Sequence, residues 1–87
     1  MEGFGELLFK AVDDTMRVVF GESAAELIYR LVEGHVSLKQ KEIGEKIETF
    51  YAYLEKLLGS ERAQIIQNTS LKFLCLKLRR EYEEVQK

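Results

Sequence analysis

Three places in this sequence carry side chains suited to chemistry: a histidine, a cysteine and a pair of carboxylates. His35 is the only histidine, and a general base or proton switch needs a positioned partner besides the imidazole. It follows Gly34 in an expected connection between helices, where a solvated or helix-capping imidazole is the more common arrangement. A catalytic role for His35 is therefore not expected.

Cys75 is the only cysteine, so the sequence excludes an internal disulfide and contains no Cys/His pair at zinc-ligand spacing. On a helix, Lys72 and Arg79 flank it three residues before and four residues after, and neighbouring cations can activate a thiol. Leucines also surround it, and a free cysteine among leucines usually packs as a small apolar group. We predict this packed environment for Cys75, and a reducing, cytoplasmic location for the chain.

Asp13 and Asp14 are adjacent carboxylates with apolar residues on both sides of them in the sequence. Neighbouring side chains on a helix point about 100° apart, so this pair does not converge easily on one atom. A solvated face is the predicted environment. The glycines at 3 and 5 do not follow a strand and lack nucleotide-binding spacing. We therefore predict no catalytic residues, no metal site and no cofactor, and thus a protein that is not an enzyme.

Amphipathic helices are expected to position these residues, because the chain has no proline and its apolar residues recur at helical spacing. The first helix is predicted from Phe4 to Phe20, with Gly21 as its stop. Ser23 followed by Glu26 has the pattern of a capping box, which predicts the start of a second helix that ends at Gly34.

Ser37 and Gln40 form a second capping-box pattern, which predicts a short helical segment through Ile43. Further helices are predicted at about 45–58 and 61–84, separated by Gly59. Residues 71–78 partly alternate, so a strand is the competing local interpretation, but a lone strand would leave its backbone groups unpaired. We predict a single all-α domain over residues 1–87: a compact bundle of four to five helices with a long C-terminal helix.

The predicted core consists of apolar residues on the apolar faces of the predicted helices. It consists of Leu8, Val12, Val19, Ile28, Leu31, Ile43, Ile47, Phe50, Leu54, Leu58, Ile66, Phe73 and Leu74. The last helix carries more apolar residues than one face can hold, which indicates burial on several sides.

The excess apolar surface of the last helix is the candidate interface. It consists of Leu71, Leu74, Leu78, Tyr82 and Val85. The seven-residue spacing of residues 71, 78 and 85 is typical of paired helices, so we predict a homodimer or a complex with a protein partner. In the alternative interpretation, other helices of the same chain cover this surface.

Charge is unevenly distributed along the chain. Residues 1–34 carry seven acidic and three basic residues, whereas residues 59–87 carry four acidic and six basic residues. This gradient could orient an antiparallel contact between two copies, but it is too weak to imply nucleic-acid binding. No apolar run approaches 18 residues, so no membrane span is expected.

DNA binding by a helix-turn-helix motif is the alternative function, because residues 24–58 are expected to follow the order helix, turn, short helix, turn, helix. Its recognition helix would start near Glu48 and include Glu55 and a single basic residue, Lys56. Acidic side chains facing phosphates oppose the electrostatic attraction that dominates such binding. Nucleic acid is therefore not the expected partner.

The pattern of glycine stops and apolar positions over about residues 9–70 resembles a family of small archaeal helical domains, the nitrosopumilus output domain type. The matching residues are Gly21, Glu22, Ser23, Ile28, Leu31, Leu38, Ile43, Phe50, Leu54, Leu58, Gly59, Ala63 and Ile66. The resemblance implies a signalling output or adaptor module that acts by association, and it implies no catalytic residues. Gly44 departs from the family pattern, which has a proline-type break there, and the chain past Leu71 is longer than that pattern requires.

Overall fold

Four α-helices and one short 3-10 turn make up the computed structural model, which describes residues 3–86 apart from the side chains of residues 81 and 84–86. In chain order they are α1 (Phe4–Phe20), α2 (Glu22–Val36), η1 (Gln40–Glu42), α3 (Ile47–Leu58) and α4 (Ser60–Gln86). The all-α fold class and the long C-terminal helix are confirmed, and α1 has the predicted bounds.

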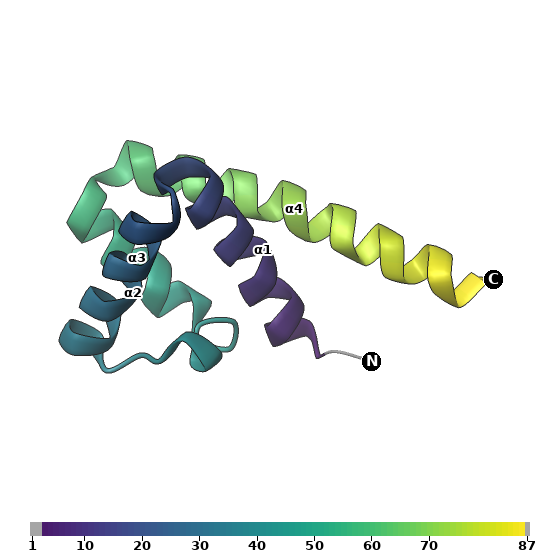
Figure 1. Cartoon of the computed structure of the whole chain (residues 1–87), viewed down its shortest axis with the longest axis horizontal. Coiled ribbons are helices and arrows are strands. Elements are labelled where there is room, and N and C mark those ends of the chain that lie inside the picture. Colours follow the sequence, from purple (N-terminus) through teal and green to yellow (C-terminus); the bar gives the residue numbers. More distant parts are fainter. Residues whose placement is uncertain (1–2, 87) are drawn as a thin grey trace.

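The long helix α4 organises the molecule (Figure 1). It packs chiefly against α1 and α3, and its 27 residues span about 40 Å at the usual helical rise. The molecule itself measures 43 Å along its longest axis. The C-terminal part of α4 therefore projects away from the end of the molecule that α2 and α3 form.

Single glycines join two of the helix pairs. Gly21 connects α1 to α2 with φ 86°, and Gly59 connects α3 to α4 with φ 91°. Each donates its N–H to the carbonyl four residues before it and accepts from the N–H four residues after it. Side chains other than hydrogen are strained in this conformation, so glycine permits two helices to meet with only one residue between them.

The predicted start and end of α2 are wrong. Gly21 already accepts the first helical hydrogen bond, from the N–H of Ala25 at 3.0 Å, so the helix begins at Glu22 and Ser23 lies inside its first turn. The helix also continues past Gly34 to Val36, and Ser37 ends it in the left-handed conformation with φ 54°. Gly34 is therefore an interior helical residue.

The second predicted capping box is wrong as well. Because Ser37 ends α2, it cannot begin the next segment, and η1 covers only Gln40–Glu42. Its turn is held by the side chain of Glu42, which accepts a hydrogen bond of 3.1 Å from the N–H of Lys39. After a turn over residues 43–46, α3 begins at Ile47 rather than Glu45.

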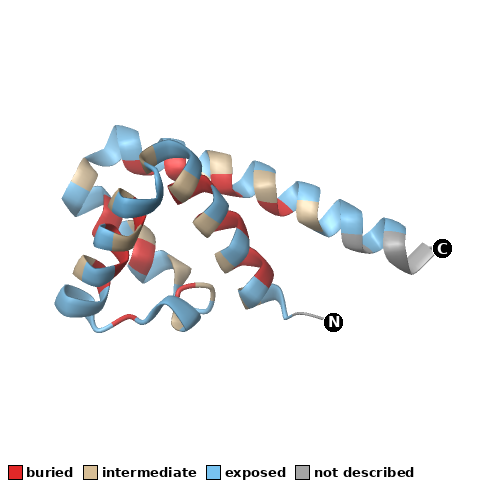
Figure 2. Ribbon diagram, viewed as in Figure 1, coloured by how far each residue is buried: buried red, intermediate tan, exposed pale blue. Residues whose placement is uncertain are grey.

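One hydrophobic core lies between the helices (Figure 2). Phe50, Ile43 and Leu54 are fully buried in it, as predicted, and Leu31 is only partly buried at its edge. Val19 does not belong to the core, because 46% of its surface is exposed. It lies in the last turn of α1, where its position on the apolar stripe is not covered by another helix.

Candidate functional site

A polar network centred on Arg17 joins α1 to α2. The Nε of Arg17 lies 3.0 Å from Oδ2 of Asp13, Nη1 lies 2.6 Å from Oε2 of Glu22, and Nη2 lies 2.7 Å from Oε1 of Glu26. The hydrogen bonds to Asp13 and then Glu26 raise the pKa of Arg17 above its ordinary value, and burial opposes them only in part. Three carboxylates thus share one guanidinium, which leaves excess negative charge at this corner.

Tyr29 completes the network from the core side. Its hydroxyl donates a hydrogen bond of 2.8 Å to Oδ1 of Asp13, and its ring packs against Phe9 and Phe50. Burial, followed by the hydrogen bond to Asp13, raises the pKa of Tyr29 well above its ordinary value. The carboxylate of Asp13 is therefore anchored by donors from both helices.

Asp13 and Asp14 point to different helices, as their adjacency on α1 requires. Asp13 faces α2, whereas Oδ2 of Asp14 lies 3.0 Å from Nζ of Lys77 on α4. The predicted solvated face is confirmed for Asp14, which is exposed, and is wrong for Asp13, which is half-buried. Each carboxylate also makes a contact between helices. The pair does not converge on a common ligand.

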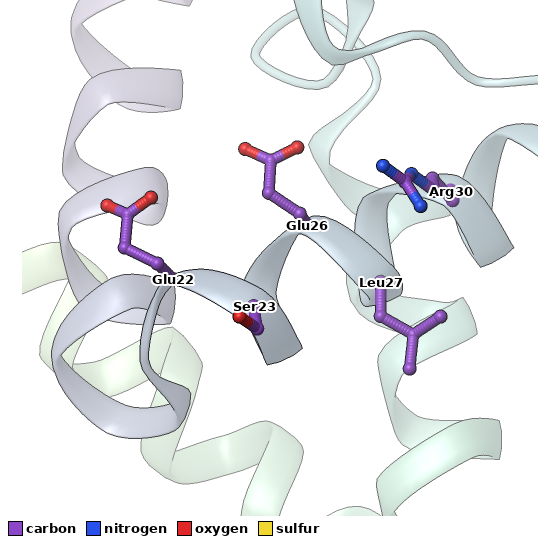
Figure 3. Close-up of a pocket in the computed structure, with 5 residues that line it drawn as sticks. All are labelled: Glu22, Ser23, Glu26, Leu27 and Arg30. Atoms are coloured by element: carbon purple, nitrogen blue, oxygen red, sulfur yellow. The ribbon is translucent and has the colours of Figure 1, made fainter.

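A shallow concavity lies beside the Arg17 network, on the outer surface of α2 (Figure 3). It is lined by Glu22, Ser23, Glu26, Leu27 and Arg30. Figure 3 shows the two carboxylates on one side of the helix and Leu27 pointing to the other. Leu27 is 56% accessible, Arg30 lies near it in the lining, and the two carboxylates are paired with Arg17.

The outward side of α4 carries a second exposed surface. Leu71, Leu78 and Tyr82 expose 48%, 40% and 66% of their surfaces, and Cys75 is exposed as well. The intervals of four, three and four residues align Leu71, Cys75, Leu78 and Tyr82 on one side of the helix. We call these four residues the outer stripe.

The structure places one of the predicted interface residues, Leu74, differently. Leu74 is only 6% exposed and packs in the core of its own chain, so it is not available to a partner. Its place on the exposed side is taken by Cys75, one residue further along the helix. Val85 lies outside the residues whose side chains the structure describes.

The predicted surroundings of Cys75 and of α4 are both corrected. Cys75 is exposed rather than packed among leucines. Among the residues of α4 whose side chains the structure describes, the buried ones face α1 and α3. These buried residues are Ala63, Ile66, Ser70 and Leu74. Cys75, Leu71, Lys72, Leu76 and Arg79 instead line a shallow concavity on the outer surface.

His35 lies in the last turn of α2 rather than in a connection. Its Nδ1 is 2.6 Å from the hydroxyl of Tyr53 on α3, and the two rings meet edge to face. The imidazole thus ties the end of α2 to α3. Among the described residues, no group of three or more histidine, cysteine or acidic side chains is arranged to hold a metal ion.

The candidate recognition helix, α3, presents a mixed surface to solvent. Its exposed positions include Glu48, Thr49, Glu55 and Lys56, whereas Phe50 and Leu54 face the core. The exposed side therefore carries more acidic than basic side chains, and phosphate contacts call for the reverse.

Comparison with known proteins gives no relative for this fold or surface. No family model matches the chain, and neither the curated proteins nor the solved structures contain a match. The similarity to archaeal output domains therefore stays a prediction. In the part of the chain that the structure describes, no helix has the length and apolar character needed to cross a membrane.

Sequence reasoning missed the Arg17 network. Asp13 and Arg17 are four residues apart on α1, and this spacing could have predicted the ion pair between them. The contacts to Glu22 and Glu26 depend on the sharp turn at Gly21, which no spacing rule supplies. Glu26 also has Arg30 four residues after it, which is ion-pair spacing on a helix, but the structure directs Glu26 to Arg17.

Proposed function

We propose that this protein is a non-enzymatic helical interaction module, of the signalling-output or adaptor kind, that self-associates through the outer stripe of α4. The observation that carries the proposal is the alignment of four exposed residues along one side of α4. Three of them are large and apolar: Leu71, Leu78 and Tyr82. Exposed apolar surface that is contiguous along one helix is characteristic of a binding surface.

The size of the domain also supports association. A chain of 87 residues buries only about 60–65% of the surface that it exposes when unfolded. A contact between two copies would remove the outer stripe from water and add to the stability of each domain. The helical repeat of the stripe is the spacing that one helix uses to pack against another.

The proposal is tested by measuring the mass of the protein in solution. Sedimentation or light scattering at micromolar concentration should give a dimer, and Leu78→Glu should give a monomer, because a carboxylate in the contact would be desolvated without a partner. Ile65→Glu is the matched control, since Ile65 is an exposed apolar residue of the same helix outside the stripe. A wild-type monomer would refute self-association, and an Ile65→Glu variant that dissociates equally would refute the stripe.

A further inference from the structure

The line of the outer stripe continues toward the N-terminal end of α4 in two polar residues. Gln64 and Asn68 are both exposed, and they precede Leu71 at the same alternating intervals of four and three residues that separate the stripe residues. In the heptad notation for paired helices, an interval of three leads from position a to position d, and an interval of four leads from d to the next a. Leu71 and Leu78 therefore occupy position d, and Asn68 occupies position a.

The amide of Asn68 is suited to meet a second copy of itself. Its Oδ1 accepts a hydrogen bond of 3.1 Å from Nε2 of Gln64. A carbonyl oxygen has a second lone pair and an amide nitrogen carries two donors, so Asn68 keeps both an acceptor and a donor for a partner. In paired helices, a single asparagine at position a selects the register that brings two asparagines together, because a buried amide without a partner is unfavourable.

Only a parallel pair in register brings Asn68 opposite Asn68 while covering the outer stripe. Each stripe residue then faces the same residue of the second copy across a two-fold axis that runs along the helices. An antiparallel pair that covers the stripe would place Leu71 opposite Tyr82. Continued along the helix, this register sets Asn68 at the level of residue 85, which is a valine in the sequence, so no second amide would be available there.

The charges at one edge of the outer stripe favour the same arrangement. Lys72 and Arg79 are exposed, and each follows a leucine of the stripe by one residue, so both lie on the same edge. In an antiparallel pair this edge faces itself, which would bring Lys72 near Arg79 of the second copy in two equivalent contacts. In a parallel pair it faces the opposite edge, at Gln67 and Leu74, where neither residue is charged. Arg79 also has an exposed contact of 3.4 Å to Glu83, so the repulsion adds less than the amide pairing does.

The packing of α4 within its own chain leaves this side of the helix open. Its buried residues are centred about 115° around the helix from the outer stripe, and they are Ala63, Ile66, Ser70 and Leu74. A two-fold axis along the helices would therefore place the remaining helices of the two copies on opposite sides of the α4 pair. On the basis that the proposed self-association is correct, we infer that two α4 helices pair in parallel and in register, with Asn68 of one copy hydrogen-bonded to Asn68 of the other.

Opposite charges at position 68 test this pairing. Asn68→Asp and Asn68→Lys should each raise the dimer dissociation constant at least about tenfold, because like charges would meet across the two-fold axis. An equimolar mixture of the two variants should form a heterodimer at least about tenfold tighter than either variant alone. Asn68 is exposed, so both variants should fold, which circular dichroism checks. Thr49→Asp and Thr49→Lys are the matched controls, because Thr49 is an exposed polar residue on α3, and they should neither weaken the dimer nor complement each other.

Single-cysteine variants measure the orientation independently. Leu71→Cys and Tyr82→Cys are each combined with Cys75→Ser, and diamide then oxidises two thiols to a disulfide. In the parallel pair each variant alone should form a covalent dimer. In the antiparallel pair the two copies of position 71 would lie about 16 Å apart along the helices, whereas a disulfide joins Cα atoms within roughly 7 Å, so only a mixture of the two variants would link. Ile65→Cys with Cys75→Ser controls for random collisions, because Ile65 is exposed outside the stripe.

The outcomes separate this inference from the proposed function. Covalent dimers that form only when the two cysteine variants are mixed would overturn the parallel pairing and retain self-association through the outer stripe. A mixture of Asn68→Asp and Asn68→Lys that is no tighter than its components would overturn the pairing of Asn68 as well. A dimeric protein in which no stripe cysteine links, alone or mixed, would refute the stripe itself, and a wild-type monomer at micromolar concentration would refute both proposals.

Discussion

The hydroxyl of Tyr29 on α2 donates a hydrogen bond of 2.8 Å to Oδ1 of Asp13 on α1. Asp13 also accepts from the Nε of Arg17, so one carboxylate couples a core aromatic ring to the charged network on the surface. The contact fixes how α2 lies against α1 after the single-residue turn at Gly21. It also sets the direction in which the outer surface of α2 faces.

Removing the hydroxyl of Tyr29 should destabilise the fold. Tyr29→Phe leaves the ring packing in place and deletes one hydrogen bond to a charged acceptor, so we expect a loss of about 1–2 kcal/mol in unfolding free energy. Urea denaturation at neutral pH measures it. Tyr53→Phe is the comparison, because its partner His35 is exposed and water can replace the lost bond. An equal or larger loss for Tyr53→Phe would contradict this account.

Stability should also fall at alkaline pH because of Tyr29. Its pKa is raised in the folded chain above the ordinary value of 10.0, so its stabilising contribution is complete below pH 10. Above pH 10 the unfolded chain releases the proton first, and about 1 kcal/mol should be lost by pH 11. Denaturation of Tyr29→Phe over the same pH range should show a smaller decline. Parallel curves for the two proteins would exclude the phenol as the cause.

Two glycine substitutions should have opposite effects on stability. Gly59→Ala places a Cβ at φ 91°, which costs about 1–3 kcal/mol. Gly34→Ala lies inside α2, where a Cβ would meet no atom within 4 Å, and it should stabilise the helix by about 0.5–1 kcal/mol. Thermal unfolding monitored by circular dichroism compares the pair. A loss of stability in Gly34→Ala would show that α2 ends at this glycine, as the sequence pattern predicted.

DNA binding should be absent under the most permissive conditions. The exposed side of α3 carries Glu48 and Glu55 against the single base Lys56, and non-specific binding depends on neutralising phosphates. A gel shift with random duplex at low salt should therefore show no retardation at micromolar protein. A shifted band that disappears when salt is raised would restore the helix-turn-helix alternative.

Much of the fold follows from local sequence rules. The apolar repeat of residues 4–20 predicts α1 with its observed bounds, and Gly21 and Gly59 mark the two sharp connections. These features depend on interactions between residues that are close in sequence, so they can be predicted from the sequence alone. The capping boxes predicted at Ser23 and Ser37 are wrong, because a serine can cap a helix but does not by itself decide where the helix starts. The turn at Gly21 determined where α2 begins, and the left-handed conformation of Ser37 determined where it ends.

The sequence by itself determined that this chain forms helices and that its last helix has more apolar residues than its own core can cover. Only the tertiary structure decided which of those residues are exposed. Packing of α1 and α3 on one side of α4 buries Leu74 and leaves Cys75 in the outer stripe, a difference of one residue, or about 100° around the helix. The tertiary structure also brought Arg17 on α1 to Glu26 on α2. The direction of one helix relative to another depends on contacts between residues that are distant in sequence, so local rules did not predict this pair.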